Sequence, residues 1–213
     1  MRVCLIPMKP LAAAKERLGP ALNAAERREL SLAMLADVVA AASGFDRVWV
    51  LQSDDDAAAV AVAGGAEPHQ DPAPGDGLNA SLDAATATAV AGGASAVLVV
   101  AADIAAVTAA ELAAVAQGDG VAVAADGSGS GTNVLWRRPG NAIATCFGPS
   151  SRDAHERAAT AAGAAFRVVD SPRLAADVDT PEALAVVWAL GPGPATRRAL
   201  EEMGIAARLR LAG

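Results

Sequence analysis

Short runs of apolar residues alternate along the chain with longer segments in which apolar residues recur at helical spacing. The runs are continuous, which is typical of strands that are buried on both faces of a parallel sheet. They are "RVCLI" at 2–6, "RVWVLQ" at 47–52, "AVLVVAA" at 96–102, "GVAVAA" at 120–125, "TNVLW" at 132–136 and "AFRVVD" at 165–170. A brief strand is also expected near Ala66 and Glu67, before a Pro/Gly/Asp stretch at 68–77 that is too irregular for a helix or a strand.

Polar capping residues mark where helices should begin between these runs. Asn23 with Glu26, and Thr108 with Glu111, have the spacing of a capping box, and Asp54 can cap a short helix. Further helices are predicted in "LNASLDAATATAVA", "FGPSSRDAHERAATAAG", "TPEALAVVWAL" and "GPGPATRRALEEMG". Strands that alternate with helices predict an α/β fold, with a mostly parallel central sheet and helices on both faces. The sequence shows no linker and no internal repeat, so we expect one domain over residues 1–213.

Composition narrows the possible functions. The formal net charge is −7, and no basic stripe interleaves with aromatic residues, so we expect no nucleic-acid partner. No apolar run approaches the ~20 residues of a membrane span, and "MRVCLIPM" is too short for a secretory signal, so we expect a cytoplasmic protein without a membrane partner. The two cysteines lie far apart in the sequence and suggest neither a zinc site nor a disulfide framework.

The loop after the first apolar run carries Lys9, Lys15 and Arg17. Lys9 and Lys15 are the only lysines of the chain, and every other fixed cation is an arginine. Ligands of such folds bind beyond the carboxyl ends of the strands, and a cationic loop that enters a helix suits a polyphosphate. A retained lysine indicates that a compact point charge is needed there. The alternative is a solvated basic loop. On the functional interpretation too, Lys15 is expected to be an exposed loop residue that adds little to stability.

Three aspartates lie at strand ends or in extended segments. Asp103 follows a buried strand, and Asp177 and Asp179 are spaced so that both point to one side of an extended chain. Carboxylates on one side repel one another unless a cation lies between them, and magnesium prefers oxygen ligands. The alternatives are that Asp103 is a loop or cap residue and that Asp179 caps the helix that begins at Thr180.

Two loops of small residues could bind an anion through hydroxyl and backbone N–H groups. They supply Thr132 from "GSGTNVL" and Gly148, Ser150 and Ser151 from "FGPSS", which could hold a carboxylate or a phosphate. Neither histidine, at 69 or 155, has a nearby serine or cysteine partner in the sequence, and neither is expected to be catalytic. The arginine-rich last helix is expected to be a solvated or interface surface.

Six segments occur in an order that resembles a known enzyme family. They are "IPMKPLAAAKERLGP", "GDGLNASLDAA", "VVAADI", "DGSGSGTNVL", "FGPSSRDAH" and "ADVDTPEAL". The chain is similar to the 2-phospho-L-lactate or phosphoenolpyruvate guanylyltransferases of coenzyme F-420 biosynthesis. The resemblance implies a single-domain, three-layer nucleotidyltransferase fold of Rossmann-like type, related to the molybdenum-cofactor guanylyltransferases.

The resemblance also implies substrates and residue roles. GTP would be the donor, and 2-phospho-L-lactate, phosphoenolpyruvate or 3-phosphoglycerate the acceptor. Mg²⁺, expected as two ions, would bind Asp103, Asp177 and Asp179. The triphosphate would lie on the lysine loop, the nucleoside on Gly77, Leu78 and Asn79, and the acceptor on Thr132, Gly148 and Ser151. The chain departs from the family at Asp103-Ile104-Ala105, where the family usually has Asp-Leu-Pro.

Two other functions stay open on the sequence alone. One is a nucleotidyltransferase of the same fold that acts on a sugar phosphate or on the molybdenum cofactor. The other is a nucleotide-binding module without turnover, against which the acidic trio argues. A homodimer is compatible with the sequence but is not specified by it.

Overall fold

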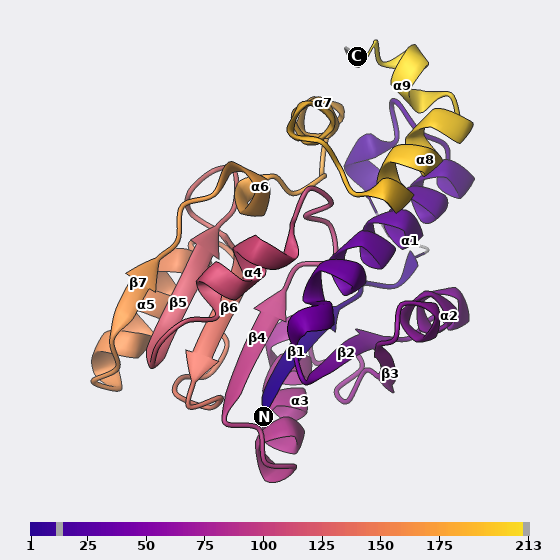
Figure 1. Cartoon of the computed structure of the whole chain (residues 1–213). Helices are drawn as coiled ribbons and strands as arrows, with labels where there is room; N and C mark the ends of the chain where they lie inside the picture. The colour runs from indigo at the N-terminus through magenta and orange to yellow at the C-terminus, as the bar shows by residue number, and fades with distance from the viewer. Residues whose placement is uncertain (12–14, 211–213) are drawn as a thin grey trace.

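The chain folds around one central sheet. A computed structural model describes residues 1–11 and 15–210. The strand order is β3-β2-β1-β4-β6-β5-β7 (Figure 1). The strands are β1 (Arg2–Pro7), β2 (Arg47–Gln52), β3 (Glu67–Gln70), β4 (Ala96–Val100), β5 (Gly120–Ala125), β6 (Thr132–Arg138) and β7 (Phe166–Val168). Among these strands only β6 runs antiparallel to its neighbours, β4 and β5. The carboxyl ends of the other strands therefore lie at the same end of the sheet as the start of β6.

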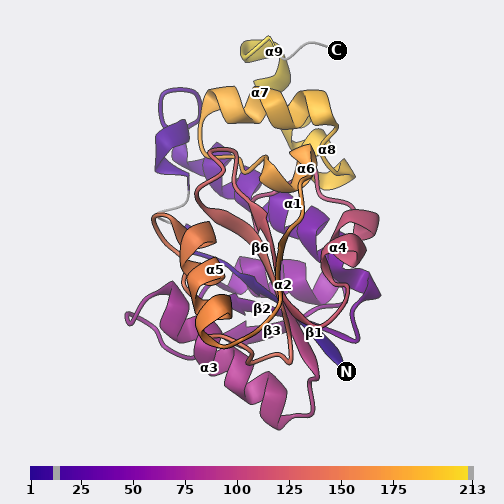
Figure 2. The same ribbon diagram turned by 90° about the vertical axis from the view of Figure 1, so that its left-hand side faces the viewer.

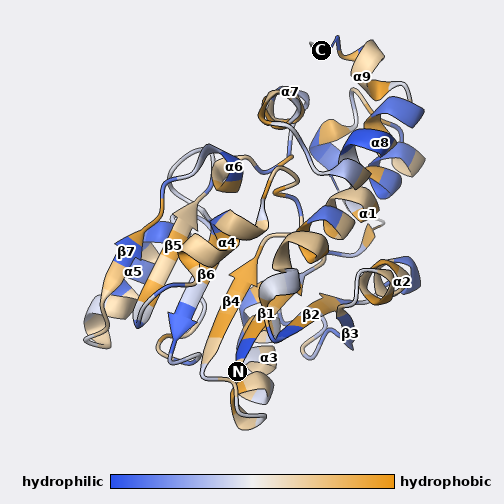
Figure 3. Ribbon diagram, viewed as in Figure 1, coloured by the Kyte–Doolittle hydropathy of each residue, from blue (hydrophilic) through white to orange (hydrophobic). Residues whose placement is uncertain are grey.

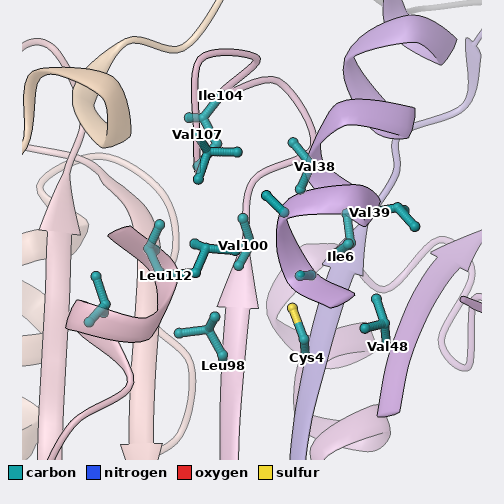
Figure 4. Packing of buried hydrophobic residues seen from close by; sticks show 14 of the residues in the cluster. Cys4, Ile6, Val38, Val39, Val48, Leu98, Val100, Ile104, Val107 and Leu112 are labelled. Carbon is teal, nitrogen blue, oxygen red and sulfur yellow. The ribbon is translucent and has the colours of Figure 1, made fainter. Parts of the chain in front are cut away.

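Helices cover both faces of this sheet, as the alternation of elements predicts. α1 (Ala24–Ala41), α2 (Asp55–Ala63) and α4 (Ala109–Val115) lie on one face, and α3 (Leu78–Ala91) and α5 (Ser151–Ala161) lie on the other (Figures 1 and 2). Strand β4 shows why both faces are apolar: Leu98 packs with the first group of helices and Val99 with the second. Figure 4 shows Leu98 and Val100 facing Leu112 of α4, and Ile6 facing Val39 of α1.

A third cluster lies beyond the carboxyl ends of the strands. The helices α7 (Pro181–Leu190), α8 (Pro194–Glu202) and α9 (Ile205–Arg208) pack there on the start of α1, with Leu184, Val187 and Leu200 fully buried. The short elements α6 (Pro172–Ala175), η2 (Glu16–Leu18) and η3 (Ala42–Gly44) complete the described structure. The outer side of α8 is polar (Figure 3), so this arginine-rich helix is solvated on one side and packed on the other.

Asp37 fixes the position of α8 on α1. Its carboxylate accepts hydrogen bonds from the N–H groups of Ala195 and Thr196, at 3.0 and 2.8 Å. A carboxylate at the first turn of a helix satisfies free N–H donors and favours the helix dipole. Gly193 leaves room for this contact, because a Cβ there would lie 2.2 Å from the carboxyl carbon of Asp37.

The predicted strands and helices form within a few residues of their expected bounds except at one sheet edge, and the structure adds the unpredicted short elements α6, α9, η2 and η3. Both capping boxes form as predicted, and Asp54 caps α2. Strand β3 extends over Glu67–Gln70, where the pattern predicted a loop from residue 68 onward. The polar composition of these residues gives no strand pattern in the sequence. Pairing with β2 and the stacking of the His69 ring on the Trp49 ring, with centroids 4.2 Å apart, stabilise the segment as an edge strand. No helix among the described residues is long and apolar enough to cross a membrane.

Candidate active site

The segment that carries Asp177 and Asp179 lies beside the carboxyl end of β4. The N–H of Val178 donates to the carbonyl oxygen of Asp103 at 3.2 Å, which joins two segments that are far apart in the sequence. The expected proximity of the three aspartates is therefore present in the structure. Asp103, Asp177 and Asp179 are all partly exposed, as a ligand site requires.

Lys15 lies between two of these carboxylates. Its ammonium donates to Asp179 Oδ1 at 3.0 Å and to Asp103 Oδ2, and its side chain is only 11% exposed. Burial alone would lower the pKa of Lys15, but the charges and hydrogen bonds of Asp103 and Asp179 raise it above its ordinary value. The expectation that Lys15 is an exposed loop residue is thus wrong, because its side chain is largely covered as the counter-ion of two carboxylates; its effect on stability stays a prediction.

The backbone of Lys15 is also unusual. Its φ is 56°, in the left-handed region that residues with a Cβ rarely adopt. A residue in this region costs of order 1–3 kcal/mol, and surrounding contacts must offset that cost. The two ion pairs of the Lys15 side chain supply such contacts.

The other two cations of this loop are more exposed. Arg17 pairs with Asp179 while its own side chain is 71% exposed, and Lys9 lies at the surface. Burial would raise the pKa of Asp179, but Lys15, then Arg17 and then Lys9 lower it below its ordinary value. Lys9 and Arg17 are thus exposed enough to contact a ligand, although Arg17 already pairs with Asp179, whereas the side chain of Lys15 is largely covered by its two partners.

Asp177 has a different environment from Asp179. Its carboxylate accepts a hydrogen bond from Asn133 Nδ2 at 3.3 Å, and Asn133 also donates to the carbonyl of Leu174 at 2.9 Å. Burial and the like charges of Asp103 and Asp179 raise the pKa of Asp177. Asn133 was missed in the sequence because it reads as one polar residue within an apolar strand.

The helix-cap alternative for Asp179 fails. The cap of α7 is Thr180, whose side chain accepts from the N–H of Ala183 at 3.2 Å. Asp103 caps no helix either, since α4 begins five residues later at its own cap, Thr108. Neither carboxylate is explained by local helix structure.

The donor set fits a hard divalent cation by its chemistry. It consists of three carboxylates whose charges affect one another, and oxygen-rich sets of this kind suit magnesium. No three carboxylate, histidine or cysteine side chains in the described part of the chain already have the spacing of a metal site. In this arrangement the ammonium of Lys15 supplies the positive charge between Asp103 and Asp179.

The predicted anion-binding loops lie together as well. Thr132 begins β6, and the Ser151 hydroxyl at the start of α5 donates to Thr132 Oγ1 at 3.1 Å. Gly148 has a φ of 136°, with open space around its Cα, so the backbone conformation rather than crowding favours glycine. Ser150 is exposed and also adopts a left-handed conformation, with a φ of 54°.

Three consecutive backbone N–H groups before this loop are held by side chains. Those of Thr145, Cys146 and Phe147 donate to Asp83 Oδ1, His155 Nε2 and Asn79 Oδ1, at 2.9, 3.0 and 2.7 Å respectively. Asn79 Nδ2 donates in turn to the Phe147 carbonyl at 2.9 Å, so the Asn79 amide binds both the N–H and the C=O of Phe147. The anchors come from α3 and α5, and they hold the segment from which Gly148 to Ser151 extends.

The three candidate nucleoside-binding residues, Gly77, Leu78 and Asn79, differ in how accessible they are to a ligand. Gly77 precedes α3 with a φ of 92°, and Leu78 is 41% exposed, so both are accessible to a ligand. The side chain of Asn79 is instead committed to Phe147. Sequence reasoning missed the anchoring roles of Asp83 and His155, since their partners are backbone groups of another segment.

Comparison with known proteins identifies the family of the chain. A family model described as "Guanylyl transferase CofC like" matches residues 1–211. A phosphoenolpyruvate guanylyltransferase of Rubrobacter xylanophilus is 38% identical over 194 residues, which cover 88% of this chain and 93% of the relative.

Solved structures support the fold. A putative nucleotide-diphospho-sugar transferase from Desulfovibrio desulfuricans has a TM-score of 0.75 at 14% identity, covering 98% of this chain and 96% of that one. A glucosyl-3-phosphoglycerate synthase from Mycobacterium tuberculosis, solved with Mn²⁺ and uridine diphosphate, has a TM-score of 0.51 at 14% identity, covering 89% and 79%. Structural neighbours thus include an enzyme that binds a nucleotide with a divalent metal. By the match over nearly its whole length, the chain belongs to the CofC-like family of guanylyltransferases.

Proposed function

We propose that this enzyme transfers GMP from GTP to the phosphate of phosphoenolpyruvate, as a step of coenzyme F-420 biosynthesis. The observation that carries the proposal is that the Lys15–Asp103–Asp179 cluster lies beside the pair of Thr132 and Ser151. The two are linked by Asn133, which follows Thr132 on β6 and donates to Asp177. A site of this kind suits two anionic substrates side by side. The names of the curated relatives favour phosphoenolpyruvate over 2-phospho-L-lactate and 3-phosphoglycerate.

The reaction needs no general base. A phosphate oxygen of the acceptor attacks the α-phosphorus of GTP, the bond from that phosphorus to the β-phosphate oxygen breaks, and pyrophosphate leaves. The second pKa of a phosphomonoester lies near ~6, so the attacking group is already largely dianionic at neutral pH. The barrier lies in bringing two polyanions together, and cations at the site lower it.

Each residue has a proposed role. Lys9 and Arg17 are exposed beside the acidic cluster and would bind the triphosphate, and Lys15 would join them by turning from a carboxylate to a phosphate oxygen. Gly77 and Leu78 would contact the nucleoside. Thr132, Gly148, Ser150 and Ser151 would hold the carboxylate or phosphate of the acceptor.

Asp103, Asp177 and Asp179 would hold the magnesium, for which we propose two ions. When bound, the metal would neutralise phosphate charge and help to align the in-line attack. The chain itself would present these carboxylates on one side of the site. Lys15 would compensate the negative charges of Asp103 and Asp179 until the ligands bind.

Turnover of the purified protein tests the proposal. The protein is mixed with GTP, magnesium and one acceptor at a time, pyrophosphate is measured, and ³¹P NMR identifies the new phosphoanhydride. Release that requires phosphoenolpyruvate supports the proposal. Release that requires another three-carbon acid changes only the acceptor. Release only with a sugar phosphate or the molybdenum cofactor, or nucleotide binding without any turnover, would overturn it.

A further inference from the structure

His155 is fully buried on α5, directly beneath the proposed acceptor loop, and both of its ring nitrogens have partners. Nε2 lies 3.0 Å from the backbone nitrogen of Cys146, and Nδ1 lies 3.2 Å from Thr132 Oγ1. The ring of Phe147 packs edge-on against it at 5.1 Å. The imidazole therefore connects three segments, namely α5, the loop before Gly148 and the start of β6.

The partners of His155 define its tautomer. A backbone amide can only donate, so Nε2 must carry the lone pair that accepts from Cys146. Burial, and then the charge of Arg137, lower the pKa of His155 to about 4, so the ring is neutral at physiological pH. A neutral imidazole with a bare Nε2 carries its proton on Nδ1 and donates it to Thr132 Oγ1.

Thr132 Oγ1 also accepts from the hydroxyl of Ser151 at 3.1 Å. A hydroxyl oxygen has two lone pairs, and both are then occupied. The hydrogen of the Thr132 hydroxyl has no acceptor among the described residues, and Thr132 is 9% exposed at the start of β6. Thr132 is thereby left as a pure hydrogen-bond donor toward a ligand.

We infer that His155 is a positioning residue that fixes the Thr132 hydroxyl as a donor to an anionic oxygen of the acceptor. The inference rests on the proposed function, which places the acceptor on Thr132. A pure donor suits a carboxylate or phosphate oxygen, which can only accept, and it disfavours a ligand that would present an N–H or O–H group there. His155 thus contributes to substrate choice without touching substrate or exchanging a proton.

The tautomer can be observed directly, because the chain contains only two histidines, His69 and His155. The protein is labelled with ¹⁵N-histidine, and His69→Gln assigns the two sets of ring signals. We expect the unprotonated nitrogen of His155 to couple to both Hδ2 and Hε1, which identifies it as Nε2. We also expect the tautomer to persist between pH 6 and 8. An unprotonated Nδ1 would overturn the inference, whatever the enzyme's activity.

Two substitutions separate orientation of Thr132 from anchoring of the loop. His155→Gln places an acceptor near the Nε2 position and keeps the Cys146 contact, but it loses the donor to Thr132. His155→Asn places a donor near the Nδ1 position and loses the Cys146 contact instead. We expect His155→Gln to raise the KM of the acceptor about tenfold, with the KM of GTP nearly unchanged, and His155→Asn to raise it less.

The reverse order would show that His155 only anchors the loop, and it would overturn the inference. Thr132→Val should reproduce the effect of His155→Gln, whereas Thr132→Ser, which keeps the hydroxyl, should be milder. A thermal melt of each variant shows that it is folded. Failure of the proposed function itself looks different, because the wild-type protein would then transfer GMP to no three-carbon phospho-acid, and the inference would fall with it.

Discussion

Replacing Asp177 and Asp179 by asparagine, one at a time, should change stability in opposite directions while both changes abolish most turnover. The two side chains are two residues apart and are proposed to bind the same metal. Their surroundings differ, because Asp179 is paired with Lys15 and Arg17, whereas Asp177 faces only an amide and like charges. Without metal, we therefore expect Asp179→Asn to destabilise the protein and Asp177→Asn to stabilise it.

The sizes follow from the contacts. The Asp179 side chain is 34% exposed, so solvent screens its ion pairs, and their loss should cost about 1–2 kcal/mol. For a domain of this size, each kcal/mol shifts Tm by about 2–4 °C, which gives a decrease of about 2–8 °C. Asp177→Asn removes a half-buried like charge, keeps the volume and leaves an oxygen that can accept from Asn133. Replacements of this kind commonly gain about 0.5–2 kcal/mol.

The pH dependence supplies an internal control. The pKa of Asp179 is lowered in the fold, so its stabilising contribution is present above the unfolded pKa of about 3.9 and is lost as pH falls through the lower folded value. The pKa of Asp177 is raised, so its carboxylate destabilises the fold at neutral pH, and this penalty disappears as pH falls through the raised folded value. The advantage of Asp177→Asn should therefore shrink on acidification toward pH 4.

Thermal melts in the presence of a chelator, from pH 4 to 8, measure these effects, and steady-state kinetics with saturating magnesium measure turnover. A loss of stability in Asp177→Asn would refute the charge argument for this site. Near-normal turnover of Asp177→Asn would refute its assignment as a metal ligand. The two tests are independent, because stability is measured without metal and turnover is measured with it.

Three further predictions concern the substrates. Lys15→Ala should lower kcat/KM for GTP roughly 10²-fold or more, and it should also lower Tm. Lys15→Arg should recover only part of both losses, because a guanidinium is too wide for the position between two carboxylates. Unchanged kinetics and Tm would contradict this prediction. GTP should be strongly preferred over ATP, and comparable kcat/KM values for the two would exclude guanine specificity. Asn79→Ala should raise the KM of the acceptor more than the KM of GTP, because the Asn79 amide holds Phe147. A selective loss of GTP affinity would instead show that Asn79 binds the nucleoside.

Much of the fold could be predicted because its signals are local. The buried strands are continuous apolar runs, and the capping boxes at Asn23 and Thr108 mark the starts of α1 and α4. The full length of strand β3 could not be predicted beyond Glu67, because Glu67–Gln70 carries no apolar run and alternates between half-buried and exposed positions at a sheet edge. This extension depends on pairing with β2, and a polar edge strand carries no local signal of that pairing.

The site was predictable as a set of positions but not as a set of contacts. Residues that follow parallel strands must gather at the carboxyl ends of those strands, so Lys15 and Asp103 could be grouped without a structure, whereas Asp179 was joined to Asp103 only by the family resemblance. Which of them touch depends on side-chain packing between segments more than 80 residues apart in sequence, such as Lys15 and Asp103. The commitment of Asn79 to Phe147 and of His155 to Cys146 depends in the same way on tertiary structure.

The placement of Lys15 also bears on how an acidic protein can bind a triphosphate. Asp103, Asp177 and Asp179 carry three carboxylates, and among the described residues Lys15 and Arg17 form ion pairs with them, while Lys9 acts on Asp179 from a greater distance. The cluster of the three carboxylates and their two ion-paired cations therefore leaves little positive charge for a free nucleotide, whose own charge is negative. On the proposed function, a divalent cation that arrives with the nucleotide would reverse this balance and would free the ammonium of Lys15 for the phosphates. Because a lysine ammonium is a compact charge on a flexible stem, it can serve both partners in turn, which a planar guanidinium held by two carboxylates could not do as readily.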